Sequence, residues 1–441
     1  MASEIRVNNI KALTGLGTVT ISSDGIDVGA GIITANNFTG SLTGTASTAT
    51  ASATAYGISG TPTLSGITSV STSNLTVNGN AYPTAGPLSN RNIIINGAMQ
   101  VAQRGTSFSL AHDGTTSAYT LDRFVVNMSG ADQWDCTVTQ SSEAPDGYAN
   151  SLLITTGTPE NAIAAAEYMS VQYKVEAQDL QQIASGTSAA KDMRLSFWVR
   201  SSQTGTFAFG IYKAPQTQRG LSATYTINSA NTWEQKTLSI PGDTAGGGID
   251  DNNGLGMNFY WLLAAGSDWT STDSTSWINY VTTGLAYGHA QNGVVTTASA
   301  TWQITGIQLE VGSVATPFEH RSYGDELARC QRYYYRISHE SNNFSFGSGF
   351  NQTTSHTRTN VFFPVTMRSS PSALEQSGTA GDYAILNRTT SDTCSVAPVY
   401  TAATKNVAEV QLQTSTGITA GDGSLGSFTN TDAFLAWSAE L

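Results

Sequence analysis

Two tryptophans stand close to two aspartates within residues 260–287. Sugars present axial C–H faces that stack on flat aromatic rings, while their hydroxyl groups need carboxylate or amide partners. The loop 266–277 offers both kinds of group and is too polar to form the core of a strand. We therefore expect either a glycan site here or, with equal weight, tryptophans that anchor the loop on the fold. The candidate residues are Asp268, Trp269, Asp273 and Trp277.

A second group of aromatic residues begins with three consecutive tyrosines at 333–335 and continues into a loop rich in Phe, Gly, Ser and Asn. Consecutive residues of a strand point to opposite faces, so the tyrosines must divide between a buried and an exposed side. We expect a glycan site near the C-terminal end, or aromatic packing at an axis shared by several chains. The candidate residues are Tyr333, Tyr335, Phe346, Phe350 and Asn351.

Residues able to bind metals or catalyse reactions are scattered along the chain. No pair of the five histidines has the i, i+4 spacing of a metal site, and the three cysteines lie far apart without a Cys-x-x-Cys motif. Nucleophile elbows and phosphate-binding loops are absent from the sequence. We predict no catalytic residue, no metal and no cofactor, and three buried free thiols.

In one loop, Asp243, Asp250 and Asp251 surround three glycines at 246–248. A negatively charged loop is a poor phosphate cradle. We expect a solvated turn, with a weak calcium site as the alternative.

Composition limits the possible partners. Charged residues make up only 12% of the 441 residues, and the formal net charge is −12, so a polyphosphate partner would be repelled. The one local basic group, Arg329, Arg332 and Arg336, is too short to reverse this. We predict no nucleic-acid binding and no membrane insertion, because no apolar run approaches the roughly 18 residues of a membrane span. The opening residues lack the apolar core of a signal peptide, so we expect folding in the cytoplasm.

Alternating apolar residues predict strands throughout residues 91–325. In 194–200, Leu195, Phe197 and Val199 share one face, and 205–212 repeats the pattern. Further strands are expected at 233–241, 256–263 and 302–311, and a short helix at 179–184. Many short strands joined by Gly, Asn and Asp turns predict a β-sandwich or jelly roll.

The N-terminal segment differs, because no charged residue occurs between Val28 and Asn90. Phe38, Leu42 and Ala46 recur every four residues and alternate with Gly40 and Gly44. Such small residues allow close approach between several chains around an axis, while a flexible linker is the alternative. We predict a homotrimeric shaft.

Three parts of the chain resemble phage tail fibres. Residues 37–51 resemble the FxGxLxGxAxxA element of tail-fibre shafts. The segment 91–325 resembles a module of phage fibres that is similar to carbohydrate-binding jelly rolls, and 323–336 resembles the junction that follows such modules. The matching stretches of the module are 92–105, 119–124, 195–201, 232–243 and 304–319.

The resemblance implies a mainly β, elongated, homotrimeric fibre with an attachment segment and shaft at 1–90, a jelly roll at 91–325 and a β-sandwich tip at 326–441. It implies a virion protein, made in the host cytoplasm, that joins a tail or baseplate protein through its N-terminus. Its far end would bind bacterial surface polysaccharide, lipopolysaccharide or capsule, during host adsorption, without enzymatic activity. A chain truncated near Arg329 should then keep its jelly roll.

Two alternatives remain. A tailspike-type polysaccharide depolymerase would need two carboxylic acids across a sugar groove, and Asp268 and Asp273 are the available pair. A purely structural virion decoration protein is the other.

Overall fold

The computed structural model describes residues 89–112, 115–338, 344–388, 390–415 and 417–441, together with four short strands before them. The chain divides into two compact units, Met1–Val70 and Ser71–Leu441. In the first unit, β1 (Thr20–Ser22) pairs with β2 (Gly25–Asp27), and in the second, β3 (Thr76–Val77) pairs with β4 (Asn80–Ala81). The remaining residues of the predicted shaft lie outside the described part, so the shaft and its trimer stay predictions.

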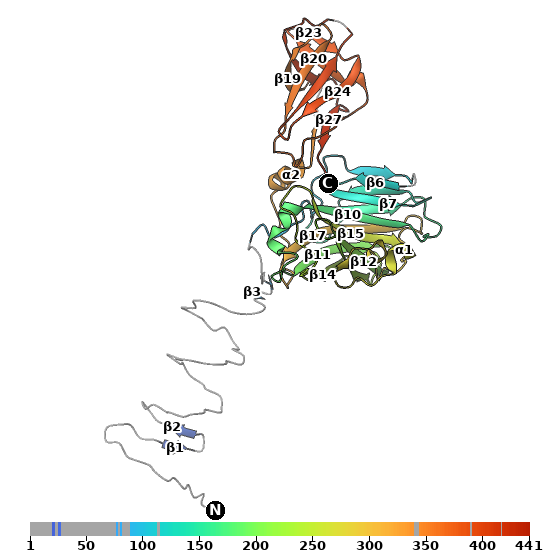
Figure 1. The fold of residues 1–441 in the computed structure, drawn as a ribbon, viewed down its shortest axis with the longest axis vertical. Coiled ribbons are helices and arrows are strands. Elements are labelled where there is room, and N and C mark those ends of the chain that lie inside the picture. Colours follow the sequence, from blue (N-terminus) through green and yellow to red (C-terminus); the bar gives the residue numbers. More distant parts are fainter. Residues whose placement is uncertain are drawn as a thin grey trace, which may run out of the picture. The chain divides into compact units, whose positions relative to one another are not determined.

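The protein is mainly β, as expected, and its largest part is a two-layered sandwich (Figure 1). One layer is a seven-stranded sheet in the order β16-β13-β12-β15-β10-β7-β6. Its strands are β6 (Thr115–Tyr119), β7 (Phe124–Ser129), β10 (Tyr168–Glu176), β12 (Gly205–Lys213), β13 (Arg219–Ile227), β15 (Leu255–Ala265) and β16 (Ile278–Asn279).

The facing layer is a six-stranded sheet in the order β14-β11-β17-β9-β8-β5. Its strands are β5 (Ser107–Leu110), β8 (Cys136–Ser141), β9 (Ser151–Thr156), β11 (Met193–Ser201), β14 (Glu234–Ile240) and β17 (Thr301–Val311). All strand pairings in both sheets are antiparallel. Short helical turns α1 (Ser267–Thr270), η1 (Ala177–Ile183) and η2 (Thr282–Gly284) connect the strands, and η1 confirms the predicted helix.

Alternation along the strands explains the core between the layers. Leu195, Phe197 and Val199 of β11, and Phe207 and Phe209 of β12, are buried in one cluster, as the sequence predicted. Because successive side chains point to opposite faces, each strand of the seven-stranded sheet also presents a second row to the outside of the sandwich. That outer row carries the candidate functional site.

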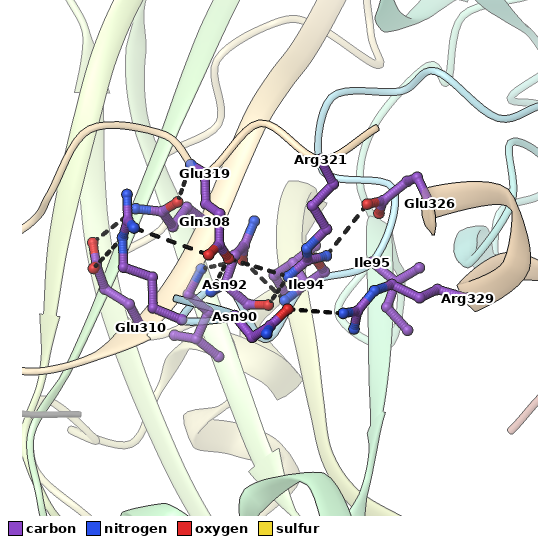
Figure 2. A network of polar contacts seen from close by, with 12 residues as sticks. Asn90, Asn92, Ile94, Ile95, Gln308, Glu310, Glu319, Arg321, Glu326 and Arg329 are labelled. Carbon is purple, nitrogen blue, oxygen red and sulfur yellow. Dashed lines mark hydrogen bonds and ion pairs between the residues drawn. The ribbon is translucent and has the colours of Figure 1, made fainter. Parts of the chain in front are cut away.

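A polar network fixes the start of the sandwich (Figure 2). Asn92 donates from Nδ2 to the Ile307 carbonyl at 3.0 Å, and its Oδ1 accepts from the backbone N–H groups of Ile94 at 3.0 Å and Leu309 at 3.1 Å. Arg321 donates to the Ile94 carbonyl at 3.1 Å and forms an ion pair with Glu326. The network therefore ties residues 92–96 to β17 and to the helix α2 (Tyr323–Gln331).

After α2 the chain forms two further sheets. A three-stranded sheet has the order β18-β27-β21, and a seven-stranded sheet has the order β23-β22-β26-β19-β20-β25-β24. The strands are β18 (Tyr334–Ser338), β19 (Ser345–Asn351), β20 (His356–Phe362), β21 (Glu375–Gln376), β22 (Tyr383–Asn387), β23 (Thr390–Thr393), β24 (Val396–Ala403), β25 (Val407–Gln413), β26 (Gly423–Phe428) and β27 (Phe434–Ser438), with η3 (Ala380–Asp382) between them. We call this part, 334–438, the C-terminal module. A separate apolar cluster fills it.

Buried charged contacts join the sandwich to Tyr333 and Glu440, the residues that flank the C-terminal module. Arg123 is 1% exposed, forms an ion pair with Glu440, and lies 3.4 Å from the ring centroid of Tyr333. Cys330 and Tyr333 belong to the core cluster of the sandwich. Residues beyond 325 thus complete the sandwich, which argues against the expected independence of a chain truncated near Arg329.

The three cysteines are free and buried, which confirms the expectation for the thiols. No helix in the described part of the chain has the length and apolar character needed to cross a membrane.

Candidate functional site

Four tyrosines gather on the outer face of the seven-stranded sandwich sheet. Tyr168, Tyr212 and Tyr260 come from the neighbouring strands β10, β12 and β15, and Tyr280 follows β16. Their strand neighbours Met169, Ile211 and Trp261 point the other way, into the core. Together with Trp269 these tyrosines pack around one small apolar cluster. We call Tyr168, Tyr212, Tyr260, Tyr280 and Trp269 the tyrosine face.

Ring contacts hold the tyrosine face together. The ring centroids of Tyr212 and Tyr280 lie 4.6 Å apart in an edge-to-face arrangement, and those of Tyr168 and Trp269 lie 4.3 Å apart. Tyr260, at 9% exposure, is the most enclosed of the four tyrosines, while the other three are half-buried. The half-buried rings leave part of their surface open to solvent, which is what a stacking ligand needs.

A row of buried amides runs beside these rings. Asn258 donates from Nδ2 to Oε1 of Gln172 at 3.1 Å, and Gln172 donates to Oγ of Ser170 at 3.1 Å. Gln172 is the strand partner of Tyr260, and Asn258 is the strand partner of Tyr212. The amide of Asn127, on the next strand, has an Oδ1 without a hydrogen-bond partner among the described residues.

The loop after β15 borders the tyrosine face. Gly210 allows this, because a Cβ at that position would lie 2.3 Å from the carbonyl oxygen of Leu285. Trp269, in α1, donates from Nε1 to the Ala166 carbonyl at 2.9 Å. The indole is therefore fixed at the edge of the face by one hydrogen bond and one ring contact.

Burial raises the pKa of all four phenols of the tyrosine face further above their ordinary value near 10. It raises the pKa of Tyr280 to about 12, and the nearby phenols of Tyr168 and Tyr212 act in the same direction. Burial also raises the pKa of Tyr260 and of Tyr168, and side-chain hydrogen bonds with Gln172 and Ser129 oppose the rise at Tyr168. The face thus offers neutral hydroxyl groups that can donate and accept hydrogen bonds.

The other candidates of the 266–277 loop have structural roles or lie apart. Trp277 packs against the sandwich core and donates from Nε1 to the Pro241 carbonyl at 2.7 Å. Asp268 is exposed at the start of α1. Asp273 is exposed and accepts from the N–H and hydroxyl of Thr275, which lowers its pKa. Of these four candidates, only Trp269 lies in the tyrosine face.

Most candidates near the C-terminus are enclosed. Tyr333 is 1% exposed beneath Arg123, and Tyr335 is half-buried against Trp437 and Phe363. Phe346 packs on Phe428 at 4.7 Å, and the buried Asn351 donates to the Thr419 carbonyl. Only the ring of Phe350, at 53% exposure, faces solvent. Tyr333 and Tyr334 are both buried, and Tyr335 is half-buried. Strict alternation does not apply to Tyr333, because it precedes β18 and packs into the sandwich core.

The three arginines of the expected basic group do not form a patch. Arg332 makes two hydrogen bonds of 2.8 Å to the carboxylate of Glu176. Arg336 lies 3.8 Å from the ring centroid of Phe434, and Arg329 donates to Oδ1 of Asn90.

Carboxylates gather at two places. Asp243 is buried, accepts from the buried Lys213 at 2.7 Å and pairs with Arg219 at 3.5 Å, so the expectation of a solvated turn is wrong at this residue and its charge is already balanced by two cations. Lys213 also donates to the Gly247 carbonyl, which explains why the glycine loop is folded inward. Asp132, Glu160 and Glu167 each place an oxygen within 4.8 Å of the others. Burial raises the pKa of Glu167, but backbone N–H groups already hydrogen-bond Glu160 and Glu167. We assign no metal to this group.

Sequence reasoning missed Tyr168, Tyr212, Gln172 and Asn258. The available signal was alternation: in 168–172, Tyr168, Ser170 and Gln172 occupy the face opposite to Met169 and Val171. Such alternation indicates a strand with one buried and one outward row, so it could have placed Tyr168 and Gln172 on the outer face.

No protein-family model matches the chain, and no curated protein sequence matches it. Some solved structures are weakly similar. The enzymatically active domain of tailspike protein 4 of bacteriophage CBA120 matches at 12% identity and a TM-score of 0.26, over 50% of this chain and 21% of that chain. A putative sugar binding protein from Bacteroides thetaiotaomicron matches at 9% identity and a TM-score of 0.27, over 50% and 100% of the two chains. A family 11 carbohydrate-binding module of a Clostridium thermocellum cellulase matches at 12% identity and a TM-score of 0.24, over 53% and 100%. Similarities of this size carry no argument about ligand or activity, which must rest on the residues.

Proposed function

We propose that this chain is a non-enzymatic, carbohydrate-binding protein of a phage tail fibre that helps the virion adsorb to surface polysaccharide of its host. The observation that carries the binding proposal is the tyrosine face, where half-buried aromatic rings and neutral hydroxyl groups lie side by side next to buried amides. Stacking on the rings would hold the sugar faces, and the phenols would bind their hydroxyls.

The chemistry of the tyrosine face favours an uncharged stretch of glycan. Its five members carry no ionised side chain, because the four phenols stay protonated. Sugar hydroxyls that leave water can form hydrogen bonds with the phenols instead, whereas a carboxylate or phosphate would find no cation in the face. Affinity at one site would be weak, and several copies per virion would raise it by avidity.

The virion setting rests on the sequence. The shaft-like repeat at 38–46 and the fibre-like stretches between 92 and 319 support a homotrimeric tail fibre held to a tail or baseplate protein through residues 1–90. Three of those stretches supply the adjacent strands β14, β11 and β17, so they support a shared fold for the module. Location in the virion and assembly in the host cytoplasm are part of the same proposal.

Substitution in the tyrosine face tests the binding proposal. The variants Tyr280→Ala and Tyr212→Ala should weaken binding to immobilised lipopolysaccharide or capsular polysaccharide of a susceptible host by roughly threefold to tenfold each, because each removes a ring contact that contributes on the order of 1 kcal/mol. Tyr280→Phe should lose less, because it keeps the ring and removes only the hydroxyl. Biolayer interferometry on the full chain measures both.

The matched control is Tyr323→Ala, which removes an exposed tyrosine of α2 outside the face. It should bind as the wild type does. Circular dichroism verifies that each variant is folded. Folded Tyr280→Ala and Tyr212→Ala variants with unchanged affinity would remove the tyrosine face from glycan recognition.

The absence of enzymatic activity is tested separately. The full chain is incubated with the same polysaccharide, and size-exclusion chromatography follows the length of the polymer. Unchanged length supports a binding role. Shortening would favour a depolymerase, and neither binding nor cleavage would favour a structural decoration protein.

A further inference from the structure

The outer face of the seven-stranded sheet in the C-terminal module exposes aromatic and aliphatic side chains. Among the described residues, eight large apolar side chains are strongly exposed, and five of them come from this one sheet. Isolated exposed apolar residues need no explanation, but a group of five on one sheet does. They are Phe350 at 53%, Phe362 at 72%, Val396 at 41%, Val399 at 48% and Leu425 at 41%.

Strand register places polar side chains between these apolar ones. Residues paired in a ladder lie on the same face of a sheet. One row across β19, β20, β25 and β24 consists of Phe350, Arg358, Gln411 and Val399. The next row, from β26 to β25, consists of Leu425, Ser348, Asn360 and Glu409. The face is therefore a mixture of rings, aliphatic groups, amides and one charged pair.

The amides of this face are free to bind a ligand. Within the described ranges of the chain, the side-chain amides of Asn360, Gln411 and Gln413 form no hydrogen bond with the protein. Asn360 is exposed, and the two glutamines are half-buried. Each amide has two N–H donors and a carbonyl acceptor. Sugar hydroxyls that leave water at this face could therefore form replacement hydrogen bonds.

The charged pair in the middle of the face is balanced. Arg358 donates to Glu409 at 2.6 Å, and the two side chains are 24% and 37% exposed. The five strands β19, β20, β24, β25 and β26 contain no other Asp, Glu, Lys or Arg. The face thus has no excess of either charge, which favours a neutral ligand over an anionic one.

The two exposed phenyl rings stand apart along the strands. Phe350 is paired with Arg358, and Phe362 lies four residues beyond Arg358 on β20. Four residues of a strand span about 13 Å. Asn360 lies between the rows of the two rings. A single sugar ring does not reach both phenyl rings, but a short stretch of polysaccharide does.

This composition fits a polysaccharide better than a protein partner. The core of a protein interface is depleted of charged residues, whereas here an ion pair and free amides separate the two rings. Phenyl rings stack on the axial C–H faces of sugars, and amides bind the hydroxyls. A polysaccharide presents both kinds of group repeatedly along its length.

We propose that the outer face formed by β24, β25, β20, β19 and β26 is a second carbohydrate-binding surface, whose ligand is an extended stretch of neutral polysaccharide. Phe350 and Phe362 stack on sugar rings, and Asn360 and Gln411 bind the hydroxyls between them. The surface has only its class of ligand in common with the tyrosine face and does not depend on that site. Two sites on one chain would raise the affinity for a long polymer by avidity.

Substitutions of different shape test stacking at Phe362. In the full chain, Phe362→Ala should weaken binding to immobilised lipopolysaccharide or capsular polysaccharide of a susceptible host by roughly threefold to tenfold. Phe362→Leu stays apolar but loses the flat ring, so it should weaken binding nearly as much, whereas Phe362→Tyr should bind as the wild type does. The control Tyr323→Ala removes an exposed ring outside both faces and should change nothing. Full affinity of folded Phe362→Ala or Phe362→Leu would overturn the proposal.

Removal of single amides tests the polar contacts. Asn360→Ala and Gln411→Ala should each weaken binding by about threefold, because each loses hydrogen bonds to the sugar. The control Asn161→Ala removes an exposed amide of the sandwich and should bind as the wild type does. Unchanged affinity in both amide variants would contradict a sugar ligand on this face.

Sedimentation distinguishes a ligand surface from a contact between chains. Phe362→Ala should sediment as the wild type does, because a glycan and not another chain occupies this face. A Phe362→Ala variant that dissociates into smaller species would make the face a protein interface and refute the proposal.

A combination of variants separates this proposal from the function proposed above. The double variant Tyr212→Ala and Tyr280→Ala should retain binding through the C-terminal face, and the addition of Phe350→Ala and Phe362→Ala should remove it. Wild-type affinity of the tyrosine variants together with weakened binding by Phe362→Ala would refute only the tyrosine face. Loss of all binding in the tyrosine double variant would refute the second surface.

Discussion

His289 shows how burial changes the chemistry of a single side chain. Its Nδ1 accepts a hydrogen bond from the Ala208 N–H, so the proton of the neutral ring is on Nε2. Nε2 has no hydrogen-bond partner among the described residues. Burial lowers the pKa of His289 to about 4. An added proton would remove the acceptor and place a charge in the sandwich.

This pKa predicts acid sensitivity. Well above pH 6.5 the histidine is neutral in both the folded and the unfolded chain, so its titration does not change the free energy of unfolding. As the pH falls towards 4, only the unfolded chain binds the proton, so the free energy of unfolding should fall by roughly 2.5 kcal/mol between pH 7 and pH 4.5. The variant His289→Gln should lack this part of the decrease. Urea denaturation at the two pH values measures the difference, and the same decrease in both proteins would contradict the prediction.

At the residue scale, the stretch singled out from the sequence overlaps the tyrosine face but does not contain all of its residues. Residues 260–287 contribute Tyr260, Trp269 and Tyr280 to the tyrosine face, because aromatic and polar residues are close together there. Tyr168 and Tyr212 come from strands about 50 to 90 residues away, and only sheet order brings them to Tyr260. The phenylalanines near the C-terminus could not be divided into core and surface until the register of β19 was known.

The segment that begins at Asn92 is tied to β17 by the hydrogen bonds of one buried side chain. The Asn92 side chain binds the Ile307 carbonyl and the Leu309 N–H, both more than 200 residues away in the sequence. It also binds the N–H of Ile94 in its own turn. No other residue type has a donor and an acceptor in this arrangement at this length.

Asn92→Ala should lower the free energy of unfolding by roughly 3 kcal/mol, because it leaves three buried backbone groups without partners. The control Asn161→Ala removes one exposed side-chain contact with Gln133 and should cost less than about 1 kcal/mol. Thermal and urea denaturation of both variants give the comparison. Equal costs would mean that the network does not fix the start of the sandwich.

At the element scale, alternation predicted strands and their buried rows correctly for β11 and β12. Those strands are long and have one continuous apolar row, so the period of two is clear. The order of strands was not predictable in the same way. β15 lies between β10 and β12, and this pairing depends on contacts between residues far apart in the sequence, which local patterns do not contain.

For the second compact unit as a whole, the contacts around Arg123 predict cooperative unfolding. Glu440→Ala would leave the buried guanidinium of Arg123 without its carboxylate, at a cost of roughly 3–5 kcal/mol. Calorimetry of the full chain should then show the sandwich and the C-terminal module unfolding together at a lower temperature. The control Asp432→Ala removes the same charge from an exposed position and should leave the transition in place. Two separate transitions, with the sandwich unaffected by Glu440→Ala, would show that the modules are independent.

The contacts of Arg123 with Tyr333 and Glu440 also limit how such chains can recombine. A foreign C-terminal segment grafted after residue 325 would have to supply an aromatic ring in place of Tyr333 and a carboxylate in place of Glu440. Without them, Arg104 and Arg123 of the parent sandwich would lose their partners. A crossover placed before residue 91 would transfer Arg104 and Arg123 together with their partners Tyr333 and Glu440. Exchange of binding specificity between related proteins, by evolution or by design, should therefore move residues 91–441 as one block.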